Sequence, residues 1–370
     1  MINENMIYKG MYDGNLILPD VTIIKNKNID GNITVFPSNG IIFPEASRNM
    51  EGANKLKEAL KDVQELSKDK NYSIKKQDLT LKKFKEFGIQ PGAEDVVKSI
   101  LEKYVEICRE KREKGLGFGP GIQYNYTGLS PLGVSVTLGN YGIFAATLLK
   151  AAENPEYKKK LIEKGQELLG NKQGFFVNPP AINAICESSD GYILFSNRGP
   201  TAEYDRMYHN VAAGHYTPKG LNSIPLEDLI DFQLKTEVGL SKKNLIELKF
   251  NGIALSAGYD ENIIGTEKIE LLAYAKLNKR LDEIAKSMGT AKHSWETRQL
   301  LAVKKKYIEQ LINGTSDSKK PVGEIPELIT YPKGVQPMGN PNSVSYWVPV
   351  GFANLVAWTG INPYKHNWTY

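Results

Sequence analysis

The stretch that decides the fold is Ala212–Leu240, AAGHYTPKGLNSIPLEDLIDFQLKTEVGL. It begins with a glycine turn at Gly214 and continues into a predicted helix over Leu226–Val238. Before it, two apolar runs, Ala181–Cys186 and Tyr192–Phe195, flank the turn sequence Ser-Ser-Asp-Gly. Because Asp-Gly between apolar runs favours a tight turn, these runs predict a β-hairpin that leads toward the glycine turn and helix.

The chain downstream of this stretch is expected to complete a mixed structure. Strands are predicted at Leu245–Leu255 and Ile269–Leu277, and the apolar spacing over Trp295–Ile312 predicts a long helix. Residues 313–345 are rich in Gly, Pro, Ser and Asn and predict an extended wrap. The ending, SYWVPVGFANLVAWTGINPYKHNWTY, is so aromatic that we expect it to dock on the body of the protein or on a partner.

Upstream, short strands precede amphipathic helices. A small meander is predicted from three β-type runs, Asn15–Leu18, Val21–Ile24 and Ile33–Phe36. Apolar residues at three- and four-residue spacing predict helices over Met50–Ser67 and Ala93–Lys114. The sequence therefore divides into an N-terminal α/β region (1–125), a central domain (126–312) and a C-terminal extension (313–370).

Composition excludes several classes of protein. The net charge of +5 is spread over 47 basic and 42 acidic residues, which favours ordinary solvated faces over a nucleic-acid interface. Cys108 and Cys186 are too few and too far apart for a disulfide framework or a zinc site. The first residues, MINENMIYKGMYDG, show no basic region followed by an apolar run, and no run of 18 apolar residues occurs, so we expect a cytoplasmic protein without a membrane span.

The glycines between Gly115 and Gly121 alternate along a short loop. Glycine-rich loops can let backbone N–H groups approach a phosphate, but this spacing matches neither the P-loop nor the dinucleotide fingerprint. Two interpretations of the segment remain, a phosphate-binding loop and a connection between structural units, and the spacing favours the connection.

The order of elements from Ala181 to Leu240 resembles the Nudix superfamily: a hairpin, a strand ending at Arg198, a glycine turn at Gly214, and a helix closing in Glu237-Val238-Gly239-Leu240. The resemblance covers roughly residues 180–312, about a third of the chain. It implies an α+β fold in which a mixed sheet is sandwiched between helices, and hydrolysis of a nucleoside diphosphate linked to another moiety. A fainter similarity, Leu129–Thr147 with its Thr-Leu-Gly-x-Tyr-Gly pattern, is to the UDP-sugar-cleaving branch.

The family's motif is degenerate in this chain. Its closing residues are matched by Leu234, Glu237, Gly239 and Leu240. Other residues occupy the positions of its conserved glycine, arginine and remaining carboxylates: Pro218, Ile224, Phe232, Gln233 and Thr236. Magnesium needs several hard, negatively charged oxygen ligands, so a single carboxylate makes a poor Mg²⁺ site. The motif therefore predicts the fold better than it predicts catalysis.

The resemblance and the residue types predict a ligand-binding site and a metal ligand. The predicted ligand-binding residues are Arg198, Gly214, His215, Tyr216 and Glu270, and the predicted metal ligand is Glu237. Arg198 is interpreted as a phosphate ligand or as half of a surface ion pair. His215 would face the ligand or make a hydrogen bond, and Glu270 would line the cleft or face solvent from an edge. For Glu237 the alternative to metal ligation is a hydrogen bond to the glycine turn.

Weaker candidates surround these residues. A loop metal site could draw on Glu203, Asp205 and His209, whereas Glu227 and Asp231 are expected to pair with Lys235 or solvent. Rings at Tyr124, Tyr126 and Tyr141 could stack a base or sugar, with buried packing as the alternative. No catalytic residue is assigned, and Cys186 lies in a predicted strand interior, which argues against a thiol nucleophile.

Three functional hypotheses follow. The first is a Nudix-fold protein that binds a nucleotide or nucleoside-diphosphate-linked ligand with weak or no Mg²⁺-dependent hydrolysis. The second is an active hydrolase of nucleoside diphosphate derivatives, using Glu237 with Glu270 or loop carboxylates. The third is a scaffold subunit whose aromatic C-terminus and N-terminal helices contact partner proteins.

Overall fold

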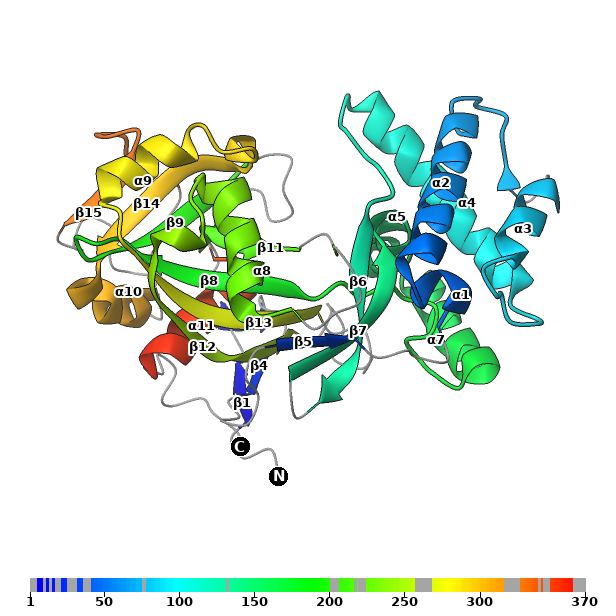
Figure 1. Ribbon diagram of the computed structural model, residues 1–370, viewed down its shortest axis with the longest axis horizontal. Helices are drawn as coiled ribbons and strands as arrows, with labels where there is room; N and C mark the ends of the chain where they lie inside the picture. Colours follow the sequence, from blue (N-terminus) through cyan, green and yellow to red (C-terminus); the bar gives the residue numbers. More distant parts are fainter. Residues whose placement is uncertain are drawn as a thin grey trace.

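The computed structural model describes residues 5–361 with gaps at 9–10, 13–14, 17–20, 25–31, 36–40, 75–77, 131–132, 200–205, 216–217, 219–223, 257–267, 316–326, 339–340 and 342–346. Helices and a mixed sheet give an α+β fold, as the sequence predicts. Figure 1 shows two lobes, one built around a large sheet and the other rich in helices. No helix of the described ranges is both long and apolar enough to cross a membrane.

A ten-stranded sheet organises the first lobe. Its strands run in the order β1 (Asn5–Tyr8), β4 (Val21–Ile24), β12 (Leu245–Ser256), β13 (Lys268–Leu277), β8 (Ala181–Glu187), β9 (Tyr192–Arg198), β14 (Thr297–Lys304) and β15 (Leu328–Tyr331). Two short strands fill the gap where β8 and β9 diverge: β10 (Tyr208–Asn210) pairs with β9, and β11 (Ala212–Gly214) pairs with β8. The β13–β8 pair is parallel and the other pairs are antiparallel, so the sheet is mixed.

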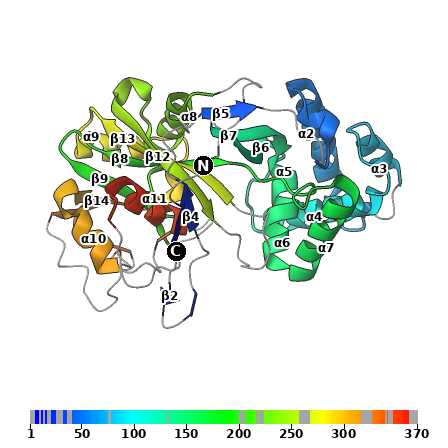
Figure 2. The ribbon, with the colours of Figure 1, turned by 90° about the horizontal axis from the view of Figure 1, so that it is seen from below.

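Helices cover both faces of this sheet (Figure 2). One face carries α8 (Leu226–Gln233), the π-helix η3 (Leu234–Val238) and α9 (Leu281–Met288); the other carries α10 (Ile308–Thr315) and α11 (Pro349–Thr359). Alternate residues of a strand point to opposite faces. In β8, for example, Ile182 packs in the apolar cluster under α8, whereas Ile185 packs in the cluster under α11. Burial on both sides explains why the central strands are mostly apolar.

The second lobe combines helices with a three-stranded sheet. Its elements are β5 (Asn32–Val35), α1 (Pro44–Ser47), α2 (Met50–Leu66), α3 (Asp78–Lys85), α4 (Glu94–Glu113), β6 (Ile122–Ser130), β7 (Gly133–Asn140), α5 (Tyr141–Phe144), the π-helix η2 (Ala145–Leu149), α6 (Lys150–Glu153) and α7 (Pro155–Leu169). The helices α2 and α4 confirm the two amphipathic segments predicted from apolar spacing. Tyr124 of β6 and Val136 of β7 belong to the same apolar cluster as α8, so the lobes share buried contacts.

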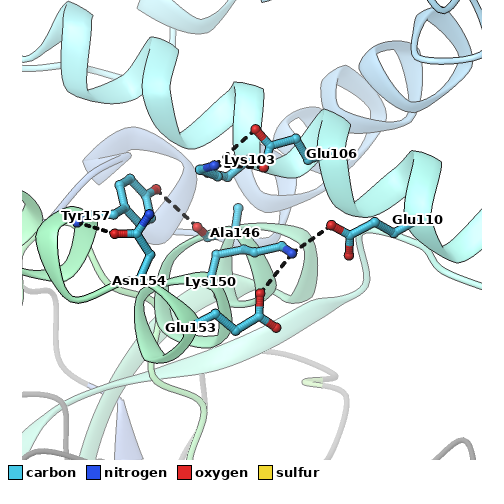
Figure 3. A network of polar contacts seen from close by, with 8 residues as sticks. All are labelled: Lys103, Glu106, Glu110, Ala146, Lys150, Glu153, Asn154 and Tyr157. Carbon is cyan, nitrogen blue, oxygen red and sulfur yellow. Dashed lines mark hydrogen bonds and ion pairs between the residues drawn. The ribbon is translucent and has the colours of Figure 1, made fainter.

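Polar contacts join α4 to the helices that follow β7 (Figure 3). The Lys150 ammonium lies 2.8 Å from a Glu110 carboxylate oxygen of α4 and 3.0 Å from one of Glu153. Only 14% of the Lys150 side chain is exposed, so this pair is better shielded than the surface ion pairs around it. The Tyr157 hydroxyl donates to the Ala146 carbonyl at 3.1 Å and thereby ties α7 to η2.

Three predictions of local structure are wrong. The helix expected over Trp295–Ile312 is instead strand β14 followed by α10. The strand lies inside the sheet with both faces covered, so consecutive buried residues from Leu300 to Val303 imitate a helical apolar pattern. The three runs expected to form a meander are strands where they are described, but they do not pair with one another: β3 (Asn15–Leu16) pairs with β2 (Met11–Tyr12), β4 pairs with β1 and β12, and β5 pairs with β7. Residues 17–18 and 36 of these runs lie outside the described part of the chain. The expected wrap over residues 313–345 contains strand β15.

The expected domain boundaries fall differently from the lobes. Residue 126 lies within β6, whose partner strand β7 belongs to the helix-rich lobe. The segments beyond residue 313 that are described, β15 and α11, complete the large-sheet lobe. Trp347 is fully buried against Phe195, with 4.9 Å between ring centroids, so this part of the aromatic ending docks on the body of the protein.

Candidate functional site

The stretch Ala212–Leu240 folds onto the α8 face of the large sheet. Gly214 ends β11 opposite Ile182, and the chain later returns as α8 and η3. The π-helix closes at Gly239, whose φ of 72° is unfavourable for a side chain. A Cβ there would also lie 2.6 Å from the Ser287 carbonyl oxygen. Both conditions require glycine, which accounts for this residue of the motif without reference to catalysis.

Glu237 is the central carboxyl of the site. One of its oxygens accepts a hydrogen bond from the Ala213 backbone N–H at 3.3 Å. Burial raises the pKa of Glu237 well above its usual range, and the negative charge of Glu296 adds to this effect. The Ala213 bond and the positive charge of Arg198 act in the opposite direction but are weaker. The site therefore disfavours the charged form of Glu237 relative to a carboxyl in water.

The neighbouring motif positions serve local structure. Gln233 is buried, and its side-chain amide donates to the His215 carbonyl at 2.9 Å. The Thr236 hydroxyl donates to the Phe232 carbonyl at 2.9 Å within the helix. Gln233 thus ties the glycine turn to the helix, Thr236 bonds within the helix, and neither side chain offers negative charge. Across the described ranges, no group of three or more His, Cys, Asp or Glu side chains could hold a metal ion.

Arg198 reaches the same region from the end of β9. Strand alternation places it on the face of Leu194, which packs with η3. Its charge acts on both Glu237 and His209. The Arg198 guanidinium therefore supplies positive potential to this end of the sheet.

The site is completed by a turn in a segment whose apolar spacing predicts a helix. The 3₁₀ turn η5 (Ser294–Glu296) precedes β14. The Gly199 N–H donates to the Glu296 carbonyl at 2.7 Å, and the His293 N–H donates to the Thr236 carbonyl at 2.8 Å. Glu296 was missed because the segment was expected to be helical, and a helix would not join β9 to η3 in this way.

His215 lies where the two lobes meet. Its ring is 5.8 Å from that of Phe144 in an edge-on arrangement, and its Nδ1 lies 3.4 Å from the Pro180 carbonyl. The adjacent candidate Tyr216 lies outside the described residues. Gly214 comes close to Glu237 and Gln233, because an added Cβ would lie 3.2 Å and 3.3 Å from their side-chain oxygens. Thus Gly214, His215, Glu237 and Arg198 gather at one end of the sheet.

Glu270 does not join this group. Strand alternation places it on the opposite face of the sheet, where its carboxylate accepts from the Asn183 side chain at 3.2 Å. Asn183 in turn accepts a bond from Asn354 of α11 at 3.1 Å. Because the sheet separates Glu270 from Glu237, the two carboxyl groups cannot form one cleft wall.

The weaker candidates have ordinary surroundings. His209 is buried, and burial lowers its pKa well below the usual value, with Arg198 adding to the effect; its proposed partners Glu203 and Asp205 lie outside the described residues. Asp231 pairs with Lys235 at 2.5 Å, as expected.

Other candidates are accounted for by packing. Tyr124 is buried in the core, and the Tyr141 ring packs between Phe118 and Phe144. Burial raises the pKa of the Cys186 thiol to about 12, with a smaller contribution from Glu237, and this opposes thiolate chemistry.

No family model matches this chain, and no curated protein matches it. Two solved structures are similar over part of their length. One is DR0079 from Deinococcus radiodurans, with 9% identity and a TM-score of 0.20, covering 27% of this chain and 56% of that one. The other is the Nudix domain of Shewanella oneidensis NrtR in complex with ADP ribose, with 8% identity and a TM-score of 0.21, covering 28% of this chain and 63% of that one. Both matches span less than two thirds of the other protein, and likenesses this slight place the chain in no family.

Proposed function

We propose that this protein binds a nucleotide or a nucleoside-diphosphate-linked ligand at the candidate site, with little or no Mg²⁺-dependent hydrolysis. The resemblance of Ala212–Leu240 to a Nudix box supports the ligand class, and the mixed sheet between helices agrees with that resemblance. Arg198 supports a phosphate-bearing ligand, because a guanidinium can form two parallel hydrogen bonds with phosphate oxygens.

The desolvation of the partly buried Glu237 carboxyl is the observation that carries the loss of hydrolysis. This carboxyl is the only acidic group at the carboxylate positions of the aligned motif, and its surroundings favour the neutral form. Magnesium binding would require ionised oxygen ligands, whereas Gln233 and Thr236 offer neutral groups that are engaged in local hydrogen bonds. The donor set therefore does not fit Mg²⁺.

Thermal unfolding with and without ligand tests this proposal. A ligand that binds only the folded state at one hundred times its Kd stabilises it by about 2.7 kcal/mol. We expect ADP-ribose or a UDP-sugar to raise the melting temperature equally with and without Mg²⁺, with phosphate release at background. Arg198→Ala should remove the shift, and Arg48→Ala, at an exposed arginine in the other lobe, should keep it. A panel without any stabilising compound would refute ligand binding.

An active hydrolase is the second candidate, and one observation favours it. Glu296 lies close enough to Glu237 for its charge to act on that carboxyl, so two acidic groups meet at the site. In the same assay, metal-dependent phosphate release that is lost in both Glu237→Gln and Glu296→Gln would establish this candidate over the first.

A further inference from the structure

The turn η5 holds an exposed tryptophan beside the candidate site. Trp295 is 55% exposed, whereas Trp347 is fully buried and Trp358 stacks on Tyr274 with 5.1 Å between ring centroids. Large aromatic rings are usually buried, because their exposure to water is unfavourable. Trp295 contributes little to the core, so folding alone does not account for an aromatic ring at this position.

The backbone around Trp295 is fixed on two sides. The His293 N–H bonds to the Thr236 carbonyl of η3, and the Gly199 N–H, directly after β9, bonds to the Glu296 carbonyl. Gly199 packs so closely that an added Cβ would lie 2.6 Å from the Trp295 carbonyl oxygen. The turn is thus clamped between the element that carries Glu237 and the strand that carries Arg198.

Side-chain contacts connect the indole to the site. The Trp295 and His293 rings lie 6.0 Å apart between centroids. His293 Nδ1 lies 3.4 Å from a Glu296 carboxylate oxygen, and the Glu296 charge acts on Glu237. Side-chain contacts thus join Trp295, His293 and Glu296, and Glu296 is near enough to Glu237 for its charge to raise the pKa of that carboxyl.

We propose that Trp295 is the stacking platform for the nucleobase of the bound ligand. This inference rests on the proposed function. A nucleobase offers a flat π face to any aromatic ring, and stacking on an exposed ring tolerates different bases. Arg198 lies at the end of the neighbouring strand, so one extended ligand can place its phosphate near the guanidinium and its base on the indole.

Calorimetric titration with two probes tests the platform. ADP-ribose carries a base, and ribose 5-phosphate carries a sugar and a phosphate without one. Loss of a stacking partner weakens binding of a base by about 5- to 150-fold. We expect Trp295→Ala to weaken ADP-ribose binding within this range and to leave ribose 5-phosphate binding unchanged, and Trp295→Phe to recover most of the affinity. Ile246→Ala, which removes an exposed apolar side chain from the distant strand β12, is the matched control.

The outcomes separate this inference from the proposed function. Equal ADP-ribose affinity in wild type and Trp295→Ala would overturn the platform and leave nucleotide binding in place. Equal losses for both probes would overturn it as well, because the variant would then have disturbed the turn rather than a base contact. A wild-type protein that binds neither probe would overturn both proposals. Circular dichroism melts of each variant establish that it is folded before titration.

Discussion

Replacement of Glu237 by Gln should stabilise this protein more at pH 7 than at pH 5. Glu237 is partly buried, and desolvation of its carboxyl raises its pKa well above the usual range. Glutamine has nearly the same shape, and its carbonyl oxygen can still accept the Ala213 N–H bond that Glu237 accepts at 3.3 Å. The substitution therefore removes the titration and the repulsion from Glu296 while keeping the contact.

The direction of this pH dependence follows from the number of protons bound by the folded and the unfolded protein. An unfolded glutamate ionises near pH 4.3, so above that pH the folded protein holds a proton that the unfolded chain has released. Folding stability therefore falls as the pH rises from this value to the raised pKa of Glu237. Each pH unit in that window costs about 1.4 kcal/mol. Between pH 5 and pH 7 the advantage of Glu237→Gln over wild type should thus grow, by about 3 kcal/mol at most.

Urea unfolding at pH 5, 6 and 7 measures this advantage directly. Glu227→Gln removes an exposed carboxylate from the same helix and is the matched control, with no comparable growth expected. If the difference between Glu237→Gln and wild type stays constant or shrinks toward pH 7, Glu237 is ionised and favourably paired. In that event the argument against a metal ligand at this position is wrong.

Further predictions concern the C-terminal helix and its approach to the sheet. Trp347→Ala should lower the free energy of unfolding by about 3–5 kcal/mol in urea titrations, because it empties a fully buried site and leaves the Pro341 carbonyl without the indole N–H that lies 2.7 Å away. Asn354→Ala should cost about 1–3 kcal/mol in the same assay, since its side-chain amide satisfies the Asn183 and Ala273 carbonyls at 2.7 and 3.1 Å. A fully stable Asn354→Ala variant would show that these carbonyls find other donors.

Local sequence patterns were sufficient to predict an element where one periodicity of apolar residues dominated. The amphipathic helices α2 and α4 and the β8–β9 hairpin were predicted because each is specified by residues close together in the chain. Strand β14 was not predicted, because a strand that is buried on both faces loses the alternation of apolar and polar residues and resembles part of a helix. The large sheet also recruits β1 and β15 from distant parts of the chain, and sequence spacing cannot reveal such pairings.

The candidate site was likewise predictable only where its residues are close together in the sequence. The motif correctly brought Gly214 and Glu237 together, because both belong to one turn-and-helix unit. It could not show that Glu270 points to the other face, since that depends on the register of β13 against β8. Glu296 and Trp295 could not be predicted as site residues, because their proximity to η3 depends on the backbone hydrogen bond between His293 and Thr236.

The arrangement of the two lobes along the chain has a consequence for biosynthesis. The core of the helix-rich lobe lies within residues 41–177, a continuous stretch that can collapse while later residues are still being made. The large sheet contains strands from before residue 25 and from after residue 327, and α11 packs on one of its faces, so it is complete only when nearly the whole chain is present. We therefore expect refolding to proceed in two phases, and during synthesis we expect the edge of β4 that pairs with β12 to stay open to aggregation until β12 has been made.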